Sequence, residues 1–408
     1  MTSDSDETAP PAPLRGVTVV EVAHWVAGPA VGGVLADWGA DVVKVEPPGG
    51  DPMRTIWEAV GANPDAPNGA FIAANRGKRS LAVDVTTGAG RAVLDRLLAS
   101  ADVLVTNLRP RALARLGLAP AEVAARFPRL VYCSLTAYGW GGPDEERAGY
   151  DLAAFYGRAG VAHETTTEGE PPAPLMLGIG DMFTAMTAAG GVTAALLERE
   201  RTGRGRFVEA SLLRTGMWAL SGSLGGAALG GRPRPPAPRH ECPTPMFNAY
   251  RAGDGRWFFL VGVQAARLLP KLLAAIDRAD LLADERFADA RGIARHRREF
   301  IAILDEAFAA HPLDEWAKTF DAHDVWWAPV QTPFDLLTDA QARATGAWVD
   351  VDLEAGAGGT VASVDAPVRF DGRARTTAPG PPAVGQHTRE VLTALGYSDD
   401  EITDLLPQ

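Results

Sequence analysis

The chain has 408 residues, of which 46% are hydrophobic and 22% are charged, and its net charge is −12 at pH 7. This length and composition are typical of a globular protein of about two domains. The acidic balance argues against a general nucleic-acid-binding protein, which would carry a basic surface. No apolar run approaches the roughly 18 residues that a membrane helix needs. Cys133 and Cys242 have no paired spacing, so we expect a cytoplasmic protein with structural thiols.

The first 13 residues are acidic and then rich in proline and alanine, and we expect a disordered leader there. Strand and helix patterns alternate from Leu14 onward. The expected strands are 17–22, 41–46, 80–85, 102–107 and 129–136. The expected helices are 28–38 and 88–100, with further helical segments within 110–127. Alternation of this kind predicts an α/β fold with a parallel sheet and helical crossovers.

The second half of the chain changes character. Helices are expected at 181–202 and 211–229, followed by a proline-rich loop, a hairpin over 248–261 and several more helices. A strand is expected at 325–330, and 331–408 mixes helices with short strands. We therefore expect four parts, namely a leader (1–13), a large α/β domain (14–205 with 331–408), a linker helix and loop (206–245) and a small domain (246–330).

Several common chemistries lack their motifs. The glycines after the first strand, Gly28-Pro-Ala-Val-Gly-Gly33, do not have the spacing of a dinucleotide fingerprint, and no phosphate-binding P-loop pattern occurs. The seven histidines have no metal-site spacing, so we expect no metal. A serine-hydrolase elbow is also absent from the sequence.

Two basic clusters follow or precede strands. Asn75-Arg-Gly-Lys-Arg-Ser80 lies just before one predicted strand, and Asn107-Leu-Arg-Pro-Arg111 lies just after another, with Arg115 a turn further on. Ligands of parallel sheets bind beyond the carboxyl ends of the strands, where arginines can hold phosphates by charge-assisted hydrogen bonds. The alternative is an ordinary solvated charged face.

Asp181 stands between Gly180 and a helical pattern. An aspartate at this position can be a simple helix N-cap without any function. It would also suit a catalytic carboxylate, because the helix dipole favours the ionised form and the flanking glycines let a substrate approach the backbone.

Eight segments in order resemble the class III CoA-transferases, the CaiB/BaiF type. They include His24-Trp-Val-Ala-Gly-Pro29, the run from Leu35 to Pro47, Asn75–Asp84, Asp102–Pro110, Gly149-Tyr-Asp151, Gly180-Asp181, Arg201–Gly205 and Gly385–Val391. The resemblance spans about Leu14 to Leu406. It implies a Rossmann-like large domain, a smaller α+β domain and a homodimer whose chains are interlocked rings.

The resemblance also implies the roles of individual residues. Asp181 aligns with the nucleophilic aspartate of the family. The positions that align with CoA contacts are His24, Val26, Ala27, Arg76, Arg79, Val83, Asn107, Arg109 and Arg115, and Tyr150 and Asp151 align beside the thioester. CoA enters as a thioester substrate, with no permanently bound cofactor, and the other partner is a carboxylic acid.

Two departures bear on the reaction. Tyr150 stands where the racemase branch of the family has a histidine, and a tyrosine with a pKa near roughly 10 is a poor acid/base group at neutral pH. The glycine-rich shielding loop of formyl-CoA transferase has no counterpart, since Arg232–Pro245 carries prolines. We expect transfer of CoA between acids, with a racemase-like epimerase, transfer within one dicarboxylic acid, or a non-catalytic CoA-binding protein as alternatives.

Overall fold

The computed structural model describes residues 12–59, 63, 67–174, 178–232, 235–353, 359–372 and 374–405. The chain forms two units, each with its own core. The large unit consists of Met1–Val161, Pro174–Gly231 and Ala340–Gln408, and the small unit consists of Ala162–Ala173 and Arg232–Asp339.

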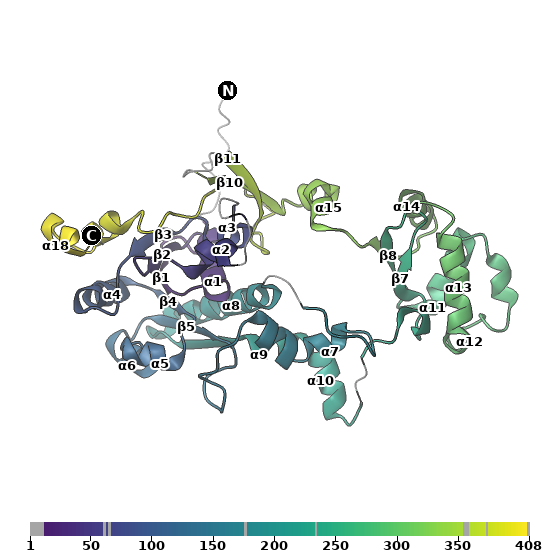
Figure 1. Ribbon diagram of the computed structural model, residues 1–408, viewed down its shortest axis with the longest axis horizontal. Coiled ribbons are helices and arrows are strands. Elements are labelled where there is room, and N and C mark those ends of the chain that lie inside the picture. Colours follow the sequence, from purple (N-terminus) through teal and green to yellow (C-terminus); the bar gives the residue numbers. More distant parts are fainter. Residues whose placement is uncertain are drawn as a thin grey trace. The chain divides into compact units, whose positions relative to one another are not determined.

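A parallel six-stranded sheet forms the centre of the large unit (Figure 1). Its strands are β1 (Thr18–Val22), β2 (Asp41–Glu46), β3 (Arg79–Ala82), β4 (Val103–Thr106), β5 (Val131–Thr136) and β6 (Phe207–Ser211). Every neighbouring pair is parallel, as predicted, and the order is β3-β2-β1-β4-β5-β6. The order reverses between β1 and β4. At such a switch point the crossovers leave in opposite directions and open a crevice at the carboxyl ends of the strands.

Alternate residues of the strands point to two helical layers. Val19 of β1 packs with α1 (Ala27–Asp37) and α8 (Ile179–Thr202), whereas Val20 and Val22 pack on the opposite face. The helices of that opposite face are α4 (Gly88–Ser100), α5 (Pro110–Arg115), α6 (Pro120–Arg126), α17 (Thr388–Ala394) and α18 (Asp399–Leu405). Because both faces are covered, the strands are apolar runs rather than alternating ones.

Shorter elements surround this frame. The N-terminal half contributes η1 (Pro52–Thr55), α2 (Ile56–Ala59), α3 (Gly69–Asn75) and the π-helix η2 (Leu152–Arg158), and α9 (Leu212–Ala219) and α10 (Ser221–Ala228) follow β6. Helix α7 (Val161–Thr165) begins at the last residue of the N-terminal segment of the large unit and otherwise belongs to the small unit. A second sheet of order β11-β10-β12 is formed by β10 (Trp348–Leu353), β11 (Gly359–Val364) and β12 (Thr377–Pro379), after α16 (Ala340–Ala344). Val349 and Val351 of β10 pack against Ile72 of α3.

The small unit combines an antiparallel sheet with helices. Strands β7 (Phe247–Arg251), β8 (Trp257–Val261) and β9 (Trp327–Pro329) confirm the predicted hairpin and the later strand. The helices are η3 (Arg239–Glu241), α11 (Ala265–Ala275), η4 (Ala279–Ala283), α12 (Ala290–Arg295), α13 (Arg297–Phe308), α14 (Leu313–Ala322) and α15 (Pro333–Thr338). Tyr250, Phe258, Phe308 and Phe320 are fully buried and meet ring to ring.

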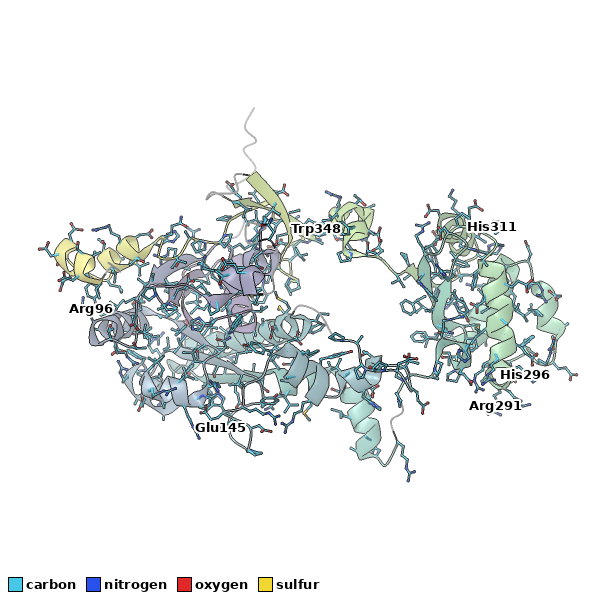
Figure 2. All side chains as sticks on the ribbon, viewed as in Figure 1. Arg96, Glu145, Arg291, His296, His311 and Trp348 are labelled. Atoms are coloured by element: carbon cyan, nitrogen blue, oxygen red, sulfur yellow. The ribbon has the colours of Figure 1, made fainter. Side chains whose placement is uncertain are left out.

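Two histidines of the small unit, His296 and His311, lie apart (Figure 2). His296 contacts Glu299 at 3.4 Å and His311 contacts Glu315 at 2.9 Å, near opposite ends of this unit (Figure 2). Within the part of the chain that the structure describes, no group of three His, Cys, Asp or Glu side chains is arranged to hold a metal ion. Among the same residues, no helix combines the length and the apolar character required to cross a bilayer.

Candidate active site

The turn from β1 into α1 lies at the switch point of the sheet. Asn107, just after β4, binds both backbone polar groups of His24. Its side-chain oxygen accepts from the His24 backbone N–H at 3.0 Å, and its Nδ2 donates to the His24 backbone carbonyl at 2.7 Å. Trp25 has a left-handed backbone with φ 69°, a conformation unusual for a bulky residue. The Asp51 carboxylate accepts its N–H at 3.1 Å. Side chains from distant segments thus hold the turn in this shape.

Behind the turn lies a buried group of charges that sequence reasoning missed. The Lys44 Nζ donates to Glu21 at 3.0 Å, to Asp51 at 2.9 Å and to the Ala23 carbonyl at 3.1 Å. Lys78 donates to the other Glu21 oxygen at 2.6 Å. Burial alone would lower the pKa of Lys44, but the carboxylates of Glu21 and Asp51 raise it above its ordinary value. A lysine inside the apolar run of β2 was the available sequence signal.

Asp181 lies in the first turn of α8, opposite the same turn. The helix begins at Ile179, with the left-handed Gly178 (φ 74°) as its N-cap residue. The interpretation of Asp181 as a cap was therefore wrong by three positions, because Gly178 takes the left-handed conformation that other residues avoid. A side chain on Gly178 would meet Val26 Cγ1 at 3.4 Å and Asp181 Oδ2 at 3.5 Å, so these two groups flank one open spot.

Close packing explains the glycine before Asp181. A Cβ on Gly180 would lie 2.3 Å from the Phe155 ring, far inside the contact distance of about 3.5 Å. Phe155 belongs to the π-helix that follows Asp151 and stacks on Phe183 at 6.2 Å between ring centroids. This packing sets the π-helix directly against the first turn of α8.

Two carboxylates therefore share the site. The Asp151 Oδ2 accepts from the Gly180 N–H at 3.2 Å, while its buried Oδ1 has no hydrogen-bond partner among the described residues. Burial raises the pKa of Asp151. Burial and, second, the charge of Asp151 raise the pKa of Asp181 to about 7. A carboxylate with a pKa near neutrality, poorly solvated and open to the substrate side, is a suitable nucleophile or base.

A cavity of about 840 Å³ opens at the carboxyl ends of β1, β2 and β3. Three of the predicted positions, His24, Val83 and Arg115, line it. Burial lowers the pKa of His24, so its ring is neutral at pH 7. Thr87 and Arg91 at the start of α4 also line the cavity and were missed; the signal was a threonine cap, which accepts from the Gly90 N–H at 3.1 Å.

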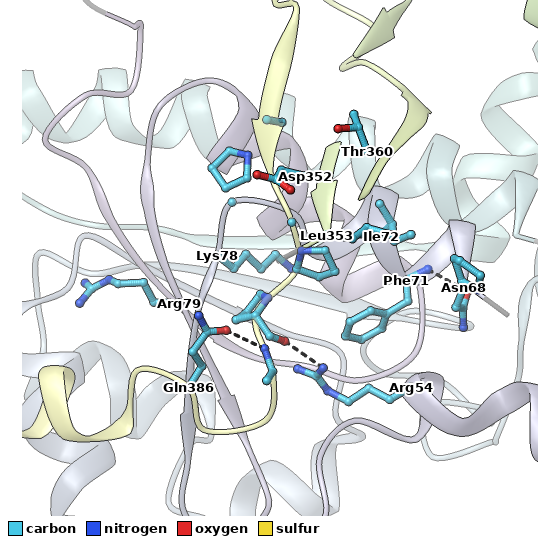
Figure 3. A pocket seen from close by; sticks show the side chains of 18 of the residues that line it. Arg54, Asn68, Phe71, Ile72, Lys78, Arg79, Asp352, Leu353, Thr360 and Gln386 are labelled. Carbon is cyan, nitrogen blue, oxygen red and sulfur yellow. Dashed lines mark hydrogen bonds between the residues drawn. The ribbon is translucent and has the colours of Figure 1, made fainter. Parts of the chain in front are cut away.

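A larger cavity of about 1190 Å³ lies elsewhere in the large unit, between α3, the start of β3 and the second sheet (Figure 3). Its cationic side chains already have partners. Arg54 binds Glu46, and Arg79 binds Asp41 and Glu390. We regard the smaller cavity as the ligand site, because it lies at the switch point of the sheet and His24 joins it to the turn. One of its own arginines, Arg91, is likewise paired, with Asp95 at 3.1 Å.

The predicted positions fall into three groups. Val26, Ala27, Tyr150, Asp151 and Asp181 gather around the turn and the first turn of α8, where Tyr150 packs edge-on against Trp25 at 5.8 Å. His24, Val83, Asn107 and Arg115 connect this corner to the cavity. Arg76, Arg79 and Arg109 engage other partners, since Arg76 binds Asp37, Ser363 and the Val364 carbonyl, and Arg109 donates to the Glu146 carbonyl at 3.4 Å.

Comparisons with known proteins agree with this architecture. A family model described as CoA-transferase family III matches residues 14–388. The chain is 32% identical to the (R)-2-hydroxy-4-methylpentanoate CoA-transferase of Clostridioides difficile, over 96% of this chain and 97% of that one. It is 29% identical to the succinyl-CoA:glutarate CoA-transferase of Homo sapiens, over 97% and 89%. A crystal structure of a CAIB/BAIF family protein from Brucella suis superposes with a TM-score of 0.82 at 30% identity, covering 95% of this chain and 100% of that one. The chain therefore belongs to CoA-transferase family III and is a CoA-transferase of this class, as its motifs predicted.

Proposed function

We propose that the enzyme moves CoA from an acyl-CoA to a free carboxylic acid through covalent intermediates on Asp181. The observation that carries this proposal is the pairing of Asp181 with Asp151 in a poorly solvated corner, beside a cavity at the switch point of the sheet. Near pH 7 a large fraction of Asp181 is ionised and can attack, and its limited solvation leaves it reactive.

The reaction proceeds in four balanced steps. The Asp181 carboxylate attacks the thioester carbonyl, the carbon–sulfur bond breaks, and CoA thiolate leaves behind a mixed aspartyl–acyl anhydride. The thiolate then attacks the aspartyl carbonyl and releases the first acid as a carboxylate, which leaves an aspartyl–CoA thioester. The second carboxylate attacks that thioester and displaces the thiolate. The thiolate finally attacks the new acyl carbonyl, releases the product and restores the Asp181 carboxylate.

The cavity at the carboxyl ends of β1–β3 is proposed to keep the thiolate attached during these steps. Arg115 is exposed at its rim and offers a guanidinium group to the phosphates of CoA. Arg91 lines the wall and donates to Asp95 and to the Gly117 carbonyl, both at 3.1 Å. The capped start of α4, which ends the β3–α4 turn, adds backbone N–H groups and the positive end of a helix dipole. Holding CoA here makes the return attack of the thiolate intramolecular, which raises its rate.

The covalent step has a direct test. Mixing the enzyme with acyl-CoA and no acceptor acid should raise the intact protein mass by that of CoA less one water. Asp181→Ala should lose this adduct and lose several orders of magnitude in transfer rate, while retaining CoA binding by calorimetry. Asp399→Ala, the same change at an 88% exposed carboxylate, should behave as wild type. An adduct that persists in Asp181→Ala would refute the assignment and direct attention to Asp151.

The same preparation distinguishes the alternatives. A racemase-like epimerase would incorporate deuterium from solvent beside the carbonyl without exchanging CoA between acids. Transfer within one dicarboxylic acid would move CoA from one end of a labelled diacid to the other without an added acceptor. A binding protein would give neither signal. The tyrosine at position 150 favours transfer, because the racemase branch of the family has a histidine at this position.

We also propose that the enzyme is a homodimer of interlocked chains. Large apolar side chains on α9 and just after α10 are exposed in the large unit, with Trp218 at 78% and Leu229 at 91%. An apolar surface of this kind is typical of a contact with another chain. Sedimentation over a wide dilution range should show a dimer at every concentration at which the protein is folded. A folded, active monomer at low concentration would contradict this proposal.

A further inference from the structure

The surroundings of Asp181 have a consequence for the acid that the enzyme accepts. The two segments that carry the paired carboxylates place large apolar side chains at the surface next to them. Tyr150 is 63% exposed and Leu152 48% exposed on either side of Asp151, and Ile179, Met182 and Phe183 are exposed in the first turn of α8. Exposed apolar side chains concentrated beside a reactive group indicate a surface that a ligand covers.

The side chain nearest to Asp181 at the open spot is also apolar. Val26 Cγ1 and Asp181 Oδ2 both lie within 3.5 Å of the position that a Cβ on Gly178 would take. Trp25 contributes its ring next to Tyr150. The neutral form of His24 adds no charge to this corner, because burial lowers the pKa of its ring.

Positive charge is missing where a second carboxylate would need it. Arg147, which precedes Asp151 in the chain, is paired with Asp144 at 3.5 Å. The arginine at the end of the π-helix, Arg158, is already paired with Asp144. The distal carboxylate of a dicarboxylic acid would thus leave water without a cationic partner and would face two carboxylates of the enzyme.

We propose that the acyl group and acceptor of this enzyme are monocarboxylic acids with an apolar, branched or aromatic body, and not dicarboxylic acids. This inference rests on the proposed function and specifies its substrate class. Relatives of the chain carry names of both kinds, one for 2-hydroxy-4-methylpentanoate and another for succinate and glutarate. Similarity to these relatives therefore does not determine the substrate class, whereas the apolar side chains around Asp181 favour monocarboxylic acids.

Two acids of the same shape isolate the effect of charge. In 4-methylpentanoate an isopropyl group stands where succinate has its second carboxylate. Each acid is tested by identity exchange, in which a CoA ester is mixed with its own ¹³C-labelled free acid and label in the ester is followed by mass spectrometry. This assay needs no knowledge of the natural partner acid. We expect kcat/KM for the 4-methylpentanoate pair to exceed that of the succinate pair by at least about tenfold.

Variants that add a cation provide the second measurement. Val26→Arg and Tyr150→Arg each place a guanidinium beside the open spot, and we expect each to reduce the preference for 4-methylpentanoate severalfold. Tyr150 is exposed, so its replacement leaves the core intact. Leu197→Arg is the control, because it adds the same charge on α8, the helix that carries Asp181. The Leu197 side chain is 60% exposed and lies about 24 Å along the helix axis from Asp181, so this variant should leave the preference unchanged.

The outcomes separate the two proposals. Exchange of succinate as fast as or faster than 4-methylpentanoate in wild type would overturn the inference while supporting the transferase. A preference that neither arginine variant changes would show that its cause lies outside this corner and would also overturn the inference. No exchange with these pairs or with 3-phenylpropanoate would refute the proposed function itself.

Discussion

Replacing Asp181 with Asn should stabilise the fold at alkaline pH while abolishing transfer. Burial and the charge of Asp151 raise the pKa of Asp181 to about 7, whereas an aspartate in an unfolded chain has a pKa of about 3.9. The folded state therefore holds a proton that the unfolded state has released. The free energy of unfolding of the wild type consequently falls as pH rises from about 4 to about 7. An asparagine does not ionise and escapes this loss.

The size of the effect follows from the two pKa values. One pKa unit corresponds to about 1.4 kcal/mol, so the full difference sets a ceiling of about 4 kcal/mol above pH 7. Between pH 5.5 and pH 8 the ceiling for the change is about 2 kcal/mol. Asp181 is only partly shielded from solvent, which roughly halves the value. We expect Asp181→Asn to gain about 1 kcal/mol more over wild type at pH 8 than at pH 5.5.

Urea denaturation followed by circular dichroism measures this difference, with protein concentration held constant because assembly contributes to apparent stability. Asp399→Asn is the matched control, since its carboxylate is exposed. Its stability relative to wild type should not depend on pH over this range. If the advantage of Asp181→Asn were the same at pH 5.5 and pH 8, the carboxyl would have an ordinary pKa and the electrostatic account of the site would be wrong.

Three further perturbations test other parts of the site. Asp151→Asn removes the negative charge beside Asp181, so the rise of kcat/KM with pH should move to lower pH. We expect a shift of only about one unit, because burial is the larger cause of the raised pKa of Asp181. An unchanged pH profile would mean that the two carboxylates do not interact. Arg115→Ala should raise KM for acyl-CoA with little change in kcat, while Arg111→Ala, at an 83% exposed side chain outside the cavity, should do neither; equal effects would argue for a general charge effect. Gly180→Ala forces a methyl into the Phe155 ring and should destabilise the protein by about 1–3 kcal/mol; Phe155→Leu in the same chain should restore part of the stability, and no loss in the single variant would contradict the observed packing.

The sheet was predictable from local patterns. The run Asp41–Glu46 ends at two prolines, and its predicted bounds as a strand match the observed ones. The predicted bounds of helix 88–100 also match those observed. Both are short segments whose boundaries are set by nearby glycine, threonine or proline. The alternation of such segments then restricts the fold to a parallel sheet, because parallel strands need crossovers.

Features that depend on long-range packing were not predictable. The expected helical stretch 211–229 is divided into α9 and α10, and the break between the helical segments of 110–127 falls at Gly117, which has a left-handed conformation (φ 59°). Strand β6 was missed, because Phe207–Ser211 is a five-residue edge strand whose partner, β5, lies more than 70 residues earlier. Its strand conformation depends on that pairing and not on its own composition.

The candidate site shows the same division between local and distant causes. Asp181 could be singled out because a glycine pair and a helix start are local signals. The shape of the β1–α1 turn beside it has causes that are not local: the Asp51 carboxylate accepts from the Trp25 N–H, and it also accepts from Lys44 in the middle of β2. The sheet order places β1 between β2 and β4, so side chains following both neighbours can reach the one turn between them. A charged lysine within an apolar strand is costly unless it is paired, and here its partners are groups that shape the turn beside the nucleophile. Buried charge in β2 is therefore best understood as support for the β1–α1 turn, a role that becomes visible only when the strands are assembled.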